Sequence, residues 1–138
     1  MEEIVIEKAA WNDTIDGVDY SSTYRPNNLT FTITAETASG SQMLDTADTS
    51  HNWTKVNPTT YTMTVSLSKD PVKYTQAEAD AYNTAHGLNT GDSDYKTTDS
   101  VKFEAWHYIL SDLPEMINGE SITYTVTETT PNGYTSSQ

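Results

Sequence analysis

The chain has 138 residues, of which 35 % are hydrophobic, and a formal net charge of −13 from 20 acidic and 7 basic residues. This length suffices for one domain with a hydrophobic core, so we expect a single domain over residues 1–138. The acidic balance excludes nucleic acids and anionic membrane surfaces as partners, because both are bound through lysine and arginine. The absence of cysteine excludes disulfides and Cys-ligated zinc, and no cofactor or metal is expected.

Residues 4–11 predict the first β-strand. Ile4, Ile6 and Lys8 share one parity, which we expect to be the core face. Lys8 then lies among apolar side chains. Its ammonium either reaches the interior or extends to water along a buried stem. Trp11 has the opposite parity and turns inward only at a bulge or at the end of the strand.

Two further strands are predicted where apolar residues alternate with threonine or serine. These residues are Leu29, Phe31, Ile33 and Ala35 in the first strand, and Tyr61, Met63, Val65 and Leu67 in the second. Residues 36–51 are polar and predict a long loop, with a short strand near Met43 and Leu44.

A short helix is predicted over residues 76–86, inside an otherwise β-rich chain. Thr75 and Glu78 have the spacing of a capping box, and Gly87 is a natural C-terminal stop. The expected buried face consists of Ala77, Ala81, Tyr82 and Ala85.

The last part of the chain predicts two strands. Residues 101–110 form the first, with a bulge or bend between Phe103 and Trp106, and Asn118-Gly119 makes a tight turn. Residues 121–128 form the second, in which Ile122, Tyr124 and Val126 line one face and Glu128 continues their parity. Glu128 is therefore either desolvated at the end of an apolar row or turned to water by fraying of the strand.

Sequence motifs of enzymes are largely absent. The three histidines are scattered, and Trp53, Tyr61 and Tyr108 form either a sugar-binding platform or part of the core. What remains is one lysine and one glutamate, each predicted on the apolar side of a strand. A desolvated, neutral Lys8 amine is a nucleophile, and a desolvated Glu128 can shuttle protons. With an asparagine or aspartate held against both, the pair can form an amide crosslink.

Several segments resemble Cna-B-type domains, the immunoglobulin-like β-modules of Gram-positive surface adhesins and pilins. They are Lys8 with Trp11-Asn12-Asp13, residues 25–33, residues 106–114 (WHYILSDLP), Gly119, residues 124–128 (YTVTE) and Gly133-Tyr134. The resemblance implies an all-β, immunoglobulin-like sandwich with an enlarged insertion at about residues 36–100. It also implies an extracellular protein whose parent is anchored to the cell wall, with neighbouring domains as partners.

Many members of that family form a spontaneous isopeptide bond. The resemblance makes Glu128 the catalytic carboxylate and Lys8 the amine, with Ile6, Trp11, Phe31, Tyr124 and Val126 as the core near the site. The family lysine usually stands two residues before the tryptophan, whereas Lys8 stands three before Trp11, so a bulge at Ala9-Ala10 is expected. The family asparagine lies on a last strand for which too few residues follow Tyr134. We therefore expect an incomplete sandwich. Its last strand either has been cut from this chain or arrives as a separate β-strand peptide that carries asparagine or aspartate.

Three functions remain open from the sequence. The first is a structural stalk or pilin module in which the crosslink replaces a disulfide and there is no turnover. The second is an adhesin domain that binds a host or glycan ligand through the insertion at about residues 36–100, without a crosslink. The third, a glycosidase with paired acids, lacks a suitably spaced pair on the predicted strands.

Overall fold

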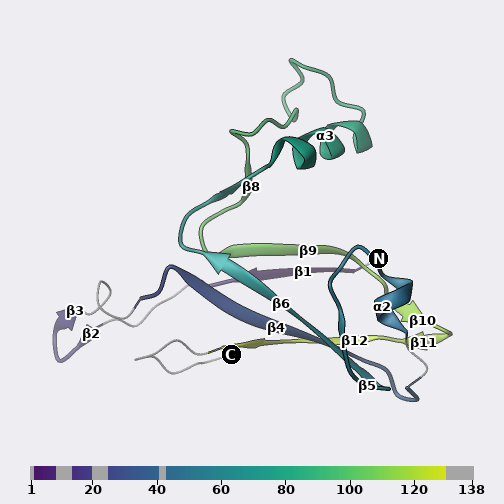
Figure 1. The fold of residues 1–138 in the computed structure, drawn as a ribbon. Helices are drawn as coiled ribbons and strands as arrows, with labels where there is room; N and C mark the ends of the chain where they lie inside the picture. Colours follow the sequence, from purple (N-terminus) through teal and green to yellow (C-terminus); the bar gives the residue numbers. More distant parts are fainter. Residues whose placement is uncertain (1, 9–13, 20–24, 41–42, 130–138) are drawn as a thin grey trace.

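The computed structural model describes residues 2–8, 14–19, 25–40 and 43–129, and most of their regular secondary structure consists of strands in antiparallel sheets (Figure 1). The main sheet has the order β12 (Thr123–Glu128), β4 (Asn28–Glu36), β6 (Thr60–Ser68) and β5 (Thr54–Asn57). A second sheet pairs β1 (Glu2–Glu7) with β9 (His107–Leu113). The two sheets share one hydrophobic core, as expected for a β-sandwich.

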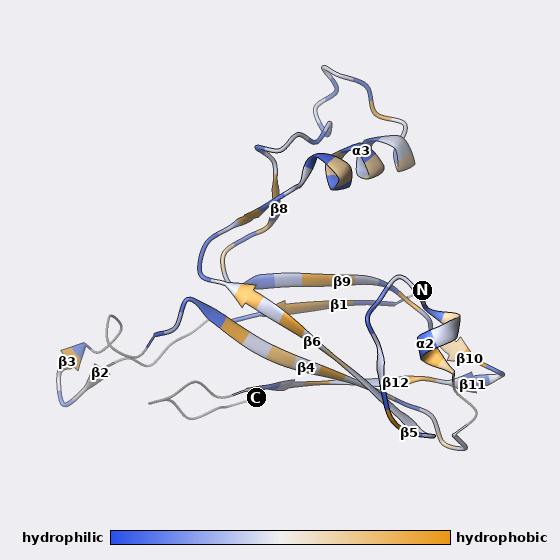
Figure 2. Ribbon diagram, viewed as in Figure 1, coloured by the Kyte–Doolittle hydropathy of each residue, from blue (hydrophilic) through white to orange (hydrophobic). Residues whose placement is uncertain are grey.

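The core confirms the alternation predicted for β4 and β6. Leu29, Phe31, Ile33 and Ala35 are all buried, as are Tyr61, Val65 and Leu67, while Met63 is partly buried against them. The threonines between these residues are more exposed. Figure 2 shows the resulting alternation of apolar and polar residues along both strands.

The predicted faces of β1 are also confirmed. Ile6 is 5 % exposed and lies opposite Tyr108 of β9, whereas Val5 is 56 % exposed and lies opposite Ile109. The inner row of β1 therefore continues toward Lys8, the residue that follows the strand.

Two hairpins have turns whose central residues both have positive φ. Asn118 (φ 49°) and Gly119 (φ 80°) connect β10 (Met116–Ile117) to β11 (Glu120–Ser121), which confirms the predicted turn. Asp16 and Gly17 do the same between β2 (Thr14–Ile15) and β3 (Val18–Asp19). Positive φ at both positions is typical of type I′ turns, which match the twist of the flanking strands.

The short strand predicted near Met43 and Leu44 is wrong, because the chain forms helix α2 (Leu44–Ala47) there. Leu44 is fully buried in the core, and the hydroxyl of Tyr61 donates a hydrogen bond to Asp45 at 3.0 Å. These tertiary contacts fix a helical turn that local sequence did not indicate. The described residues thus contain two short helices, not one.

Helix α3 (Gln76–Ala85) confirms the predicted helix and its capping box. Together with the paired strands β7 (Val72–Lys73) and β8 (Val101–Phe103) it forms an arm, residues 72–103, that projects from the sandwich (Figure 1). The predicted buried face is wrong, since the buried residues of α3 are Ala79 and Asn83. Asn83 is buried because its side-chain amide exchanges two hydrogen bonds with the backbone of Lys96.

The bend predicted between Phe103 and Trp106 is present. Trp106 has a φ of 59°, and its N–H donates to the carbonyl of Ser68 at the end of β6. This bend connects β8 of the arm to β9 of the sandwich, so it sets the position of the arm over the second sheet.

Candidate functional site

Glu128 is the last residue of β12, and it lies opposite Phe31 of β4. The hydrogen bond from Thr129 N–H to the carbonyl of Thr30 (2.9 Å) continues the pairing beyond it. Since the strand does not fray, the parity of β12 directs the Glu128 side chain inward, where it is 6 % exposed.

Lys8 follows β1 and continues its pairing with the β9 side, because its N–H donates to the carbonyl of Trp106 at 3.0 Å. Its Nζ lies 3.6 Å from Oε1 of Glu128, and its side chain is 21 % exposed. The structure therefore brings together the amine and the carboxylate that the sequence singled out. β1 and β12 run in the same direction and end on the same side of the molecule, which is why residues from both ends of the chain meet (Figure 1).

Apolar side chains surround the elements that carry this pair. Ile6 and Phe31 are buried core residues, and Tyr124 and Val126 pack against the same core from β12. Trp11 and the bulge expected at Ala9-Ala10 lie outside the described residues. An ion pair with low-polarity neighbours interacts more strongly than one in water, because fewer solvent dipoles screen its charges.

A second polar centre, which sequence reasoning missed, surrounds Asp48. This buried carboxylate accepts hydrogen bonds from Trp53 Nε1 (2.9 Å) and Ser50 Oγ (2.7 Å), and it pairs with His51 Nδ1 (2.7 Å). Burial by itself raises the pKa of Asp48, but Trp53, Ser50 and His51 together outweigh it and hold the pKa below the usual value. These hydrogen bonds hold together the loop that follows α2. The residues involved match no sequence motif, so the centre could not be predicted from the sequence.

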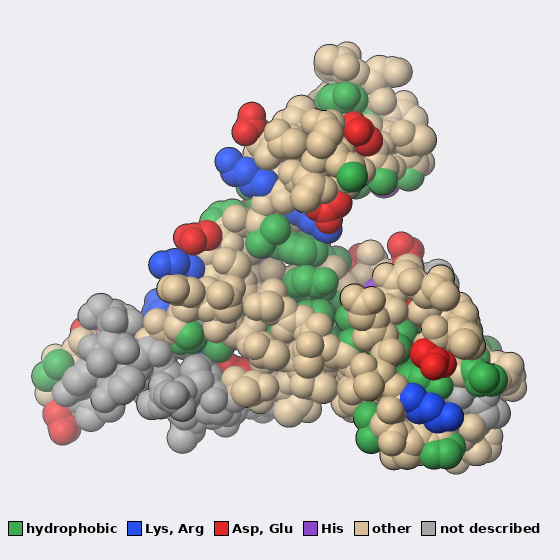
Figure 3. Space-filling model, in the orientation of Figure 1, with side chains coloured by type: hydrophobic (Ala, Val, Ile, Leu, Met, Phe, Trp, Pro, Cys, Tyr) green, Lys and Arg blue, Asp and Glu red, His purple; other side chains and the backbone are tan. Residues whose placement is uncertain are grey.

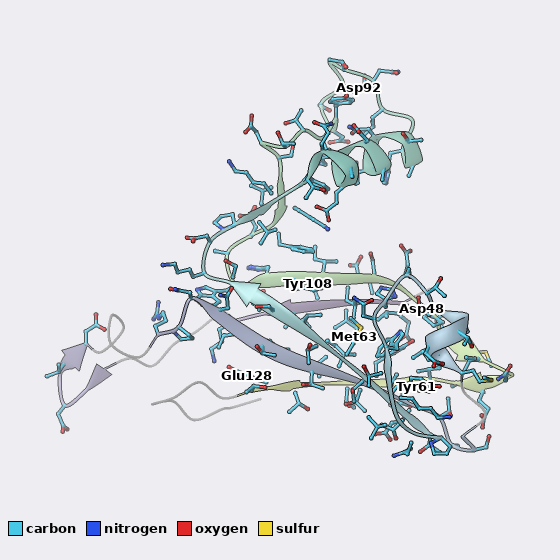
Figure 4. The ribbon with its side chains drawn as sticks, in the orientation of Figure 1. Asp48, Tyr61, Met63, Asp92, Tyr108 and Glu128 are labelled. Carbon is cyan, nitrogen blue, oxygen red and sulfur yellow. The ribbon has the colours of Figure 1, made fainter. Side chains whose placement is uncertain are left out.

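The sugar-binding platform considered from the sequence is wrong. Trp53 is 8 % exposed and Tyr61 is 1 % exposed, so both rings belong to the core. Figure 4 shows Tyr61 and Asp48 on the same side of the sandwich, away from Glu128.

The other histidines have local contacts. His86 stacks on Tyr82 with ring centroids 4.0 Å apart, and His107 Nε2 lies 3.4 Å from a carboxylate oxygen of Glu7. Within the described ranges, no group of three or more histidine or acidic residues is arranged to hold a metal ion. No helix among the described residues is long and apolar enough to cross a membrane.

Two sheets around one core, with a lysine and a glutamate paired where β1 and β12 end, define a β-sandwich module. Residues 86–138 match the family model of the Cna protein B-type domain, which confirms the resemblance and shows a Cna-B domain in this part of the chain. A Cna-B domain implies the immunoglobulin-like form of the sandwich. No curated protein and no solved structure matches the chain.

Cna-B domains are structural, non-enzymatic modules, and they occur in bacterial cell-surface proteins. The family match begins at His86 and includes β9 and β12, whereas β1 with Lys8 precedes it. The family model therefore covers Glu128 but not Lys8, and the tertiary structure places the two side chains together.

Proposed function

We propose that this module forms an isopeptide crosslink between Lys8 and an asparagine or aspartate on an additional β-strand, with Glu128 as the proton-transferring group. The observation that carries the proposal is the 3.6 Å separation of Lys8 Nζ and Glu128 Oε1 inside the end of the sandwich. A crosslink of this kind serves a structural module of a surface protein, because it resists pulling and proteolysis where no cysteine is present to form a disulfide.

The edge of β1 supplies a place for the additional strand. In the described part of the chain, β1 pairs only with β9. The hydrogen bond from Lys8 N–H to Trp106 and the register of the pair direct the backbone groups of Ile6 and Lys8 toward β9. Since backbone groups alternate along an antiparallel strand, those of Val5 and Glu7 point to the other edge. A strand added there runs directly beside the Lys8–Glu128 pair.

Docking of that strand prepares the reaction. It covers the partly exposed Lys8 side chain, and loss of water disfavours both the ammonium and the carboxylate. Transfer of one proton from Lys8 to Glu128 then removes both charges and leaves a neutral amine beside a neutral acid.

The chemical step balances without a cofactor. The lone pair of Lys8 Nζ attacks the side-chain carbonyl carbon of the acceptor, while Glu128 hydrogen-bonds the carbonyl oxygen. Glu128 then carries the proton lost by Nζ to the leaving group. A C–N bond to Lys8 forms as the original C–N or C–O bond breaks, and ammonia leaves from asparagine or water from aspartate.

The added strand is either a continuation of a longer chain or a separate peptide. We would test the proposal by mixing the protein with synthetic β-strand peptides that carry one asparagine or aspartate, and by mass spectrometry after denaturation. We expect a product lighter than the sum of its parts by one ammonia or one water, mapped to Lys8 by peptide sequencing. A longer chain that contains its own last strand should show the same loss within one molecule.

The control variants are Glu128→Ala and Lys8→Arg. Glu128→Ala should abolish the bond while leaving noncovalent docking largely intact, and Lys8→Arg should keep the charge but remove the nucleophile. A crosslink that persists in either variant, or one that maps to another lysine, would refute the assignment.

A further inference from the structure

A cleft of about 560 Å³ separates the arm from β9 on the outside of the sandwich. The arm contributes Tyr74, Glu78 and Tyr82 from α3 and its approach, and Lys102 and Phe103 from β8. The opposite wall is a continuous stretch of β9, residues 108–112, and Ser50 and His51 complete the lining. Figure 3 shows the hollow between the projecting arm and the body of the molecule, with hydrophobic side chains at its base.

The wall formed by β9 is a strand edge. Among the described residues, the only strand paired with β9 is β1. Lys8 N–H donates to the carbonyl of Trp106, and Tyr108 lies opposite Ile6 two residues further along the same register. The N–H and C=O of Tyr108 therefore also face β1. The alternation of the ladder then turns the N–H and C=O of Ile109 to the other edge, toward the cleft. Such an edge is a template for another extended segment.

The arm gives this edge an apolar wall of fixed position. The rings of Phe103 and Tyr108 lie 4.6 Å apart, which joins β8 of the arm to β9. Tyr74 and Tyr82 contact each other edge to face at 5.9 Å, and Lys102 binds Glu78, which ties β8 to α3. An added strand would therefore place alternate side chains against aromatic rings, as strand-addition sites do.

Charge favours one kind of occupant. The chain carries a net charge of −13, so a second copy would be repelled. On the cleft, Lys102 and Glu78 are paired with each other, so Asp112 supplies the carboxylate that lies outside this pair. A segment with lysine or arginine is therefore complementary, whereas an acidic one is not.

We propose that the cleft between the arm and β9 binds an extended segment of another protein, with alternating apolar and basic residues, by adding it as a strand to the free edge of β9. This site is distinct from the edge of β1 at which the crosslink is proposed, so either proposal can hold without the other.

The probe is an octapeptide of alternating lysine and valine, titrated into the full chain labelled with nitrogen-15 for NMR. We expect shifts in the amides of residues 108–112 and in the arm, and affinity that falls as salt increases. The same peptide N-methylated at alternate residues should bind about tenfold more weakly, because it cannot complete the backbone hydrogen bonds. Equal binding of the two peptides, or shifts confined to other surfaces, would overturn the proposal.

Two proline variants separate this site from the crosslinking edge. Ile109→Pro removes the N–H that faces the cleft and should lower the affinity for the peptide by about tenfold. The fold should tolerate this proline, because the N–H that it removes lies on the edge of the sheet. Val5→Pro is the matched control on the other edge: it should retain peptide binding but impair the crosslink. Sedimentation that shows a concentration-dependent dimer abolished by Ile109→Pro would overturn the assigned partner in favour of self-pairing.

Discussion

Lys8 Nζ and Glu128 Oε1 lie 3.6 Å apart although the two residues stand near opposite ends of the described chain. Each is the inward-facing residue at the end of its strand, one after β1 and the other at the end of β12. Their meeting makes the ends of these two strands interdependent, and this has consequences for stability before any crosslink forms.

Removing both members of the pair should cost less stability than the sum of the two single removals. Glu128→Gln leaves a partly buried ammonium with a weaker partner, and Lys8→Met leaves a carboxylate that is 6 % exposed without its cation. We expect the double variant to be more stable than the sum of the single losses predicts, by about 1–2 kcal/mol. Urea unfolding of the four proteins measures this coupling, and strict additivity would show that the pair contributes nothing to the fold.

Acid should destabilise the module through Asp48. The Trp53, Ser50 and His51 contacts outweigh the effect of burial and hold the folded-state pKa of Asp48 below its ordinary value of 3.8. The carboxylate therefore contributes stability that is present above that ordinary value and is lost as the pH falls through the lower folded-state pKa. The Asp48→Asn variant should have a lower free energy of unfolding than the wild type at about pH 6. This difference in free energy should become smaller toward about pH 2. Urea unfolding at several pH values measures the difference, and a difference that does not change with pH would contradict the role assigned to Asp48.

The stability of the arm should depend on the N-terminal cap of α3. Thr75 Oγ1 accepts a hydrogen bond from Glu78 N–H at 3.1 Å, and Lys102 and the Thr75 backbone lower the pKa of Glu78. Thr75→Ala should destabilise the helix by about 1 kcal/mol. Hydrogen exchange at Ala79, whose N–H bonds the Thr75 carbonyl, should quicken accordingly. Thr84→Ala, at an exposed position of the same helix, should leave this exchange unchanged.

The centre of the sandwich should be sensitive to loss of volume at Ile33. This side chain is fully buried on β4, so Ile33→Ala should cost about 2–5 kcal/mol through lost burial and the cavity left behind. Thr30→Ala changes an exposed residue of the same strand and should cost well under 1 kcal/mol. Thermal unfolding monitored by circular dichroism distinguishes them, and similar melting temperatures would place the core elsewhere.

The sequence by itself determined the faces of the strands and the limits of α3. Apolar residues such as Leu29 and Phe31 alternate with polar ones, which is the pattern of a half-buried strand. The Thr75–Glu78 capping box involves residues within one turn of the helix. The sequence also marked Lys8 and Glu128 as exceptions in apolar rows. These are local patterns, so they can be predicted from neighbouring residues alone.

Only the tertiary structure decided which elements meet. The chain forms helix α2 where a strand was expected, and Asn83 is buried on α3 in place of the predicted apolar face. The hydrogen bonds around Asp48 come from a loop that has no sequence motif. The tertiary structure also placed Lys8 beside Glu128 and opened the cleft along β9. The physical reason is that such contacts depend on the packing of segments far apart in the chain, whereas periodicity records only which side of each segment avoids water.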